Sequence, residues 1–157
     1  MLLDVSGDVF SSTHSLAHCI SQDAKMSKGI AKVFVDKFPL LSRLKHNCLS
    51  IGTAVPIRDN GRFIYSLVTK PVFHSKPTLY AVQWALHSMR AHAELHGVRQ
   101  ISAPRLGSGL DGLDFDLEVR PILSYVFADS GVKFVIYSLN IPSTFDHNRY
   151  VILDGLS

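Results

Sequence analysis

Several features that define large classes of protein are missing from this 157-residue sequence. No apolar run approaches the length of a membrane-spanning helix, and the N-terminus has no basic segment followed by an apolar one. We therefore expect neither a membrane protein nor a secreted one. The chain has two cysteines, Cys19 and Cys48, which do not make a disulfide framework, so we expect reduced thiols. These absences predict a soluble protein of the nucleus or the cytoplasm.

Charge runs and low-complexity segments are missing as well. Sixteen Lys and Arg residues against 13 Asp and Glu give a net charge of +3, and the basic residues are scattered along the chain. A mildly basic surface favours anionic ligands, but scattered charge does not by itself indicate nucleic-acid binding. The hydrophobic content of 46% is typical of a globular protein. No repeat or linker divides the chain, so we predict one domain over residues 1–157, with its core in 1–139 and a C-terminal extension in 140–157.

What the sequence does contain is an alternation of strands and helices. The apolar pattern predicts strands over residues 1–5, 15–21, 53–57, 63–69, 98–104 and 132–139, and helices over residues 30–38, 75–97 and 119–128. Asp59-Asn60-Gly61 indicates a hairpin, and Pro77 and Pro121 suit the first turns of the second and third helices. The pattern predicts an α/β fold, a three-layer α/β/α sandwich around a central mixed sheet of six strands.

A glycine-rich turn, Gly107 to Gly112, follows the strand at residues 98–104. Such a turn exposes several backbone N–H groups that suit a phosphate, and it holds one carboxylate, Asp111. A second turn of this kind, Ser27-Lys28-Gly29, opens the helix at Ile30. Ligands of α/β folds bind beyond the carboxyl ends of the strands, so the two turns predict an anion-binding cleft.

Two other motifs compete with this interpretation. Gly107, Gly109 and Gly112 match the dinucleotide pattern G-x-G-x-x-G, but they come late in the chain, and Asn140 stands where an acidic residue should follow the next strand. A glycine turn without any ligand is the bland alternative. His92 and His96 share a helix face, but Glu94 is out of register with the zinc motif H-E-x-x-H. We predict neither a metal nor a cofactor.

Three stretches in this order, Gly7-Asp8-Val9, Gly29-Ile30-Ala31 and residues 104–109, resemble the macrodomain family, whose members bind ADP-ribose. Residues 15–21, 75–78 and 109–111 are similar to the terminal ADP-ribose protein glycohydrolase branch of that family. The resemblance implies a hydrolase that removes mono-ADP-ribose from glutamate or aspartate side chains and deacylates O-acyl-ADP-ribose. Its partners would be ADP-ribose and ADP-ribosylated proteins, with ADP-ribosylated nucleic acid left open. We expect a monomer.

The resemblance also implies particular site residues. Lys76 is expected to be the nucleophile and Asp111 the acid/base. The chemistry is coherent, because a neutral amine can attack an anomeric carbon, and a helix N-terminus, where Lys76 is predicted to lie, disfavours an ammonium. The expected ADP-ribose-binding residues are Asp8, Val9, Ser21, Gly29, Ile30, Arg105, Leu106, Gly107, Ser108, Gly109, Leu110 and Leu139. A reader that binds ADP-ribose without turnover would use the same loops and stays open, as does a binder of other nucleotides.

Overall fold

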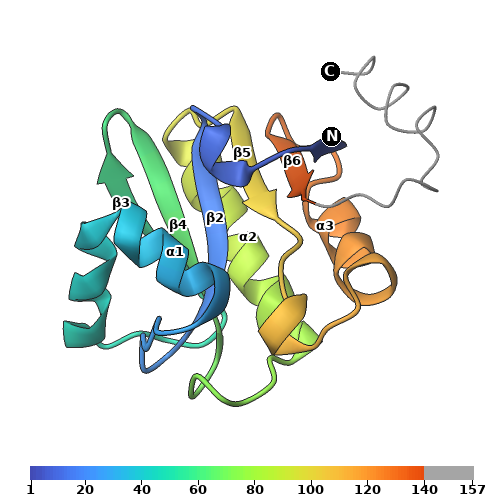
Figure 1. Cartoon of the computed structure of the whole chain (residues 1–157). Helices are drawn as coiled ribbons and strands as arrows, with labels where there is room; N and C mark the ends of the chain where they lie inside the picture. The colour runs from blue at the N-terminus through green and yellow to red at the C-terminus, as the bar shows by residue number, and fades with distance from the viewer. Residues whose placement is uncertain (140–157) are drawn as a thin grey trace.

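The computed structural model describes residues 1–139, and the predicted extension at 140–157 lies outside this range. One sheet runs through the protein (Figure 1). Its strand order is β1-β6-β5-β2-β4-β3, and every neighbouring pair is parallel except β3 and β4. The predicted mixed sheet of six strands is confirmed. The strands are β1 (Leu2–Ser6), β2 (Ser15–Ser21), β3 (Thr53–Asp59), β4 (Arg62–Lys70), β5 (Gln100–Pro104) and β6 (Lys133–Ser138).

Helices cover both faces of the sheet, which confirms the three predicted layers (Figure 1). One face carries α1 (Gly29–Lys37) and the 3-10 helix η2 (Pro39–His46), and the other carries α2 (Leu79–Leu95) and α3 (Arg120–Val126). Three further short helices follow strands or precede α3: η1 (Val9–Ser11), η3 (Gly109–Asp111) and the π-helical η4 (Phe115–Val119). Within residues 1–139, no helix combines the length and the apolar character needed to cross a bilayer.

The strand β2 is buried on both of its faces. Leu16 and Ile20 pack into the cluster under α1, together with Phe34. Ala17 packs into the opposite cluster, together with Met89 of α2. A strand that is buried on both faces has no polar side to alternate with, so its bounds coincide with the predicted run at residues 15–21.

The helix α2 begins later than the sequence predicts. Thr78 is its N-cap, and the Thr78 hydroxyl accepts a hydrogen bond from the Ala81 N–H at 3.1 Å. Pro77 is buried and precedes this cap, so it does not lie in the first turn. Lys76 therefore lies outside the helix. The expectation that the helix dipole disfavours its ammonium form does not hold. Pro121, in contrast, lies in the first turn of α3 as predicted.

The parallel strands β2, β4 and β5 end at the same edge of the sheet, because their directions agree. The loops that follow them gather along the lower edge in Figure 1. The start of α1 and the short helix η3 belong to these loops. This edge holds the candidate site.

Candidate functional site

Two adjoining cavities form an elongated cleft at the carboxyl ends of the strands. The larger has a volume of about 600 Å³ and is enclosed by the loops after β2, β4 and β5. The smaller, of about 420 Å³, lies between η1, α1 and the ends of β5 and β6. Both volumes fall in the range of small-molecule sites. Among the described residues, those that line both cavities are Ile30, Pro104, Arg105 and Ser108.

The structure brings all but one of the predicted site residues into this cleft. Lys76 is the exception, since it is exposed and lines neither cavity. The larger cavity is lined by Ser21, Gly29, Ile30, Arg105, Leu106, Gly107, Ser108, Gly109, Leu110 and Asp111. The smaller is lined by Asp8, Val9, Ile30, Arg105, Ser108 and Leu139.

The cation that contacts Asp111 is Lys70, the last residue of β4. The Lys70 Nζ donates hydrogen bonds to the Asp111 Oδ1 at 2.6 Å and to the Phe73 carbonyl at 2.7 Å. The side chains of Lys70 and Asp111 are only 9% and 16% exposed. Our sequence reasoning missed Lys70, although a signal was present. A lysine that closes an apolar strand run lies at the carboxyl edge of the sheet, where ligands bind in such folds.

Two backbone segments that suit an anion face each other across the cleft. The first N–H groups of α1 have no acceptor within the helix, and no side chain of the N-cap Lys28 satisfies them. The glycine turn after β5 lies opposite. Gly29 has a φ of +61°, and a Cβ there would lie 2.9 Å from the Leu110 Cδ1, so the two segments meet at this point. Glycine at position 29 permits both the conformation and the close approach.

Asp23 joins the loop after β2 to the loop after β4. Its carboxylate accepts hydrogen bonds from the Ser21 hydroxyl, from the Lys25 N–H at 3.1 Å and from the Phe73 N–H at 3.2 Å. Partial burial opposes ionisation, but these hydrogen bonds prevail and lower the pKa of Asp23. The Lys25 Nζ lies 4.3 Å from the centre of the Phe73 ring. These contacts hold Ser21, Lys25 and Phe73 together in one wall of the larger cavity.

His18 and Cys19 also line the larger cavity, but both side chains are uncharged at pH 7. The His18 Nε2 lies 2.8 Å from the Ser66 hydroxyl, and its ring stacks on Phe34 at 4.2 Å between centres. Burial lowers the pKa of His18 to about 3, so the ring is neutral at pH 7. Burial, reinforced by the charge of Asp111, raises the pKa of Cys19 to about 12. His18 is fully buried, as the sequence predicts, whereas Cys19 is half-buried.

Residues 1–139 contain no group of three or more His, Cys, Asp or Glu side chains arranged to hold a metal ion. The His92 and His96 rings stack at 3.9 Å between centres, and the His92 Nδ1 lies 2.8 Å from the Tyr65 hydroxyl. The side chain of Glu94 instead pairs with Arg90 at 2.6 Å. The pair of histidines thus has no acidic partner in this part of the chain.

The fold is that of a macrodomain. The macrodomain of Mycobacterium tuberculosis DarG superposes with a TM-score of 0.81 at 24% identity, covering 91% of this chain and 99% of that one. Thermosipho africanus DarTG in complex with ADP-ribose gives a TM-score of 0.78 at 20% identity, covering 95% of this chain and 44% of that one. No protein-family model matches the chain.

A curated relative defines the branch of that fold. The ADP-ribose glycohydrolase OARD1 of Homo sapiens is 38% identical over 137 residues, which is 86% of this chain and 90% of the human protein. The same enzyme of Bos taurus is 36% identical over the same length. The chain therefore belongs to the macrodomain family, in its OARD1-like branch.

Proposed function

We propose that this protein is an ADP-ribose hydrolase that releases mono-ADP-ribose from glutamate and aspartate side chains. The observation that carries the proposal is the Lys70–Asp111 pair in the wall of the larger cavity, because a nucleophile and a proton acceptor in contact are what ester cleavage needs. The name of the human relative, an ADP-ribose glycohydrolase, supports the hydrolysis of a bond to ADP-ribose.

The shape of the cleft supports ADP-ribose as the ligand. ADP-ribose has an adenosine and a second ribose joined by a diphosphate, and the cleft has two cavities joined where Ile30 and Arg105 line both. We place the adenosine in the smaller cavity, beside Asp8 and Leu139. The diphosphate then lies between the start of α1 and the glycine turn after β5, and the distal ribose reaches Lys70.

In the reaction that we propose, the Lys70 ammonium first passes a proton to Asp111. The neutral amine attacks the anomeric carbon of the distal ribose, a C–N bond forms, and the substrate carboxylate leaves with the electron pair of the broken C–O bond. Water then attacks the same carbon and the C–N bond breaks. The released amine takes one proton from that water and becomes an ammonium again. Asp111 returns its proton to the solvent. The same step applies to O-acyl-ADP-ribose when its acyl group is carried by the anomeric oxygen of the distal ribose, because attack on the anomeric carbon then expels that carboxylate in the same way.

One observation favours a second candidate, a reader that binds ADP-ribose without cleaving it. The Lys70 Nζ already makes two hydrogen bonds, to the Phe73 carbonyl and the Asp111 carboxylate, and it would have to leave them to attack a substrate carbon. The binding loops would serve a reader equally well. Turnover by the wild-type protein separates the two candidates.

The test compares ADP-ribose release from a glutamate-modified protein by the wild type and three variants. We expect Lys70→Ala and Asp111→Asn each to lower the rate at least about 100-fold, the lower range for loss of a positioned proton-transfer group. Lys76→Ala is the matched control and retains full rate, because Lys76 lies outside the cleft. Loss of release in Lys76→Ala with a normal rate in Lys70→Ala would restore the nucleophile predicted from the sequence. Wild-type binding of ADP-ribose without release would establish a reader.

A further inference from the structure

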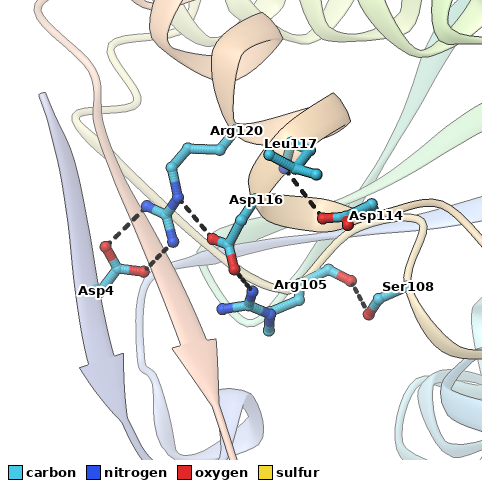
Figure 2. Close-up of polar contacts among 7 residues, drawn as sticks. All are labelled: Asp4, Arg105, Ser108, Asp114, Asp116, Leu117 and Arg120. Atoms are coloured by element: carbon cyan, nitrogen blue, oxygen red, sulfur yellow. Dashed lines mark hydrogen bonds and ion pairs between the residues drawn. The ribbon is translucent and has the colours of Figure 1, made fainter. Parts of the chain in front are cut away.

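Four charged side chains, one from β1 and three from residues 105–120, form a continuous chain of ion pairs (Figure 2). It begins at Asp4 in β1, whose two carboxylate oxygens accept hydrogen bonds from the two terminal nitrogens of Arg120 at 2.8 and 2.9 Å. The Arg120 Nε donates to the Asp116 Oδ1 at 3.0 Å. The other oxygen of Asp116 accepts from the Arg105 Nη2. The chain thus ends at a residue of the cleft.

The two inner members of this chain, Arg120 and Asp116, each contact two oppositely charged partners. Asp4 is only 5% exposed, and its paired contact with Arg120 is the planar geometry that fixes a guanidinium best. Hydrogen bonds from Arg120 to Asp4 are the main cause that raises the pKa of Arg120. Asp116 uses one oxygen for each arginine, and although partial burial opposes ionisation, the hydrogen bonds from Arg120 and Arg105 lower its pKa. The two inner members are therefore charged near neutral pH.

Both arginines of the chain of ion pairs lie against the ring of Phe115. The Arg105 Cζ lies 4.7 Å from the centre of this ring, and the Arg120 Cζ lies 5.2 Å from it. Phe115 itself is buried, so the ring is a fixed surface. Arg105 is thus fixed by an aromatic surface and by the carboxylate of Asp116. Its backbone is fixed as well, because the Arg105 carbonyl accepts from the Ser108 hydroxyl at 2.7 Å.

The position of Arg105 gives this arrangement a function. Among the described residues that line both cavities, Arg105 is the one that carries a charge. Asp116 engages one of its terminal nitrogens, which leaves further N–H donors of the guanidinium for an anion. An arginine held in place loses less conformational freedom when it binds a phosphate than a mobile one does.

We propose that Asp4, Arg120 and Asp116 are positioning residues, which hold the Arg105 guanidinium at the boundary of the two cavities, where it contacts the diphosphate of ADP-ribose. This inference rests on the proposed function, since it takes ADP-ribose as the ligand. By this inference, Asp4, Arg120 and Asp116 affect the affinity for ADP-ribose although they do not contact it. They should act on binding and leave the cleavage step unchanged.

The test uses Asp116→Asn, which removes the bridging charge from an exposed position and so disturbs the fold little. Asp114→Asn is the matched control. Asp114 is also exposed, but its carboxylate accepts from the Leu117 N–H at 3.0 Å and contacts neither arginine (Figure 2). Binding of ADP-ribose and of adenosine is measured by calorimetry for both variants. Cleavage kinetics are measured on the glutamate-modified substrate.

We expect Asp116→Asn to weaken ADP-ribose binding about three- to tenfold, the cost of immobilising one long side chain. Adenosine, which has no phosphate, binds both variants as it binds the wild type. The KM of Asp116→Asn rises in parallel with its Kd while kcat stays the same, and Asp114→Asn matches the wild type throughout. Arg120→Lys keeps the positive charge but cannot bind both oxygens of Asp4 at once. It should weaken ADP-ribose binding and leave adenosine binding unchanged, as Asp116→Asn does.

Three outcomes would overturn the inference. Unchanged or tighter ADP-ribose binding by Asp116→Asn would mean that Asp116 does not position Arg105 for the ligand, or that it competes with the phosphates. An equal loss of adenosine binding would mean that the chain of ion pairs serves only the fold. Both results leave the proposed function intact, provided that the wild type binds and cleaves. A wild-type protein that binds no ADP-ribose would overturn the proposed function and this inference together.

Discussion

Replacing Gly107 by alanine tests how tightly the glycine turn packs on the core. Gly107 has a φ of +78°, a conformation that costs a residue with a Cβ about 1–2 kcal/mol. The added Cβ would also lie 2.7 Å from the Leu113 Cδ1 and 3.3 Å from both the Leu113 Cβ and Cγ. Leu113 is 6% exposed and belongs to the core under α2, so it has little room to move. Overpacking of this kind costs about 1–3 kcal/mol.

We therefore expect Gly107→Ala to lower the free energy of unfolding by about 2–5 kcal/mol, the sum of the two contributions. The measurement is urea unfolding followed by circular dichroism at 25 °C. Gly97→Ala is the matched control, because Gly97 has a φ of +68° but a Cβ added there would have nothing within 4 Å. Gly97→Ala should lower the free energy of unfolding only by the cost of the backbone conformation, about 1–2 kcal/mol. The double variant Gly107→Ala/Leu113→Ala removes the contacts with the Leu113 Cδ1 and Cγ and keeps only the one with its Cβ, so the two changes should cost less together than the sum of the single changes.

Equal losses in Gly107→Ala and Gly97→Ala would refute this reasoning. That result would mean that Leu113 moves aside freely and that the turn is not held against the core. Losses in the two single variants that simply add in the double variant would lead to the same conclusion.

Three further predictions follow from individual side chains. The pKa of His18 is lowered from 6.5 to about 3 in the folded protein, so the unfolded state binds more protons below pH 6.5, and the stability that neutral His18 contributes is lost as the pH falls. Between pH 7 and pH 5 the wild type should lose about 2 kcal/mol more than His18→Gln in urea unfolding. Iodoacetamide at pH 8 should modify exposed Cys48 and spare Cys19, whose pKa is about 12, as a peptide map would show. Thr78→Ala should cost about 1 kcal/mol in thermal unfolding, because the Ala81 N–H loses its cap.

Much of the fold follows from local patterns in the sequence. The bounds of β2 are predictable because burial on both faces gives an unbroken apolar run. The hairpin between β3 and β4 is predictable from Asn60-Gly61, which forms its turn between the paired residues Asp59 and Arg62. The glycine turn after β5 and the turn before α1 both lie in the cleft, as their positions after strands indicate.

The partner of Asp111 could not be read from local patterns. Lys70 and Asp111 are 41 positions apart, and they meet because β4 and the turn after β5 end at the same edge of the sheet. The resemblance to the glycohydrolase branch implies Lys76 instead, and its predicted place at a helix start fits a neutral amine. Thr78 takes the cap position, however, and leaves Lys76 outside both helix and cleft. In the chain of ion pairs, the i,i+4 spacing of Asp116 and Arg120 is visible in the sequence, but the contact of Arg120 with Asp4 spans 116 positions and is not.

The two adjoining cavities have a consequence for inhibitors. Because each cavity has its own walls and the two share only a boundary that includes Ile30 and Arg105, small fragments can be found for each separately. Joining two such fragments makes the second binding event intramolecular, and a linker of the right length raises affinity by about 10²–10⁴ without a new contact. A linker that carries an anionic or strongly polar acceptor past Arg105 would suit this protein best. The length of that linker, more than the strength of either fragment, decides how tightly the joined molecule binds.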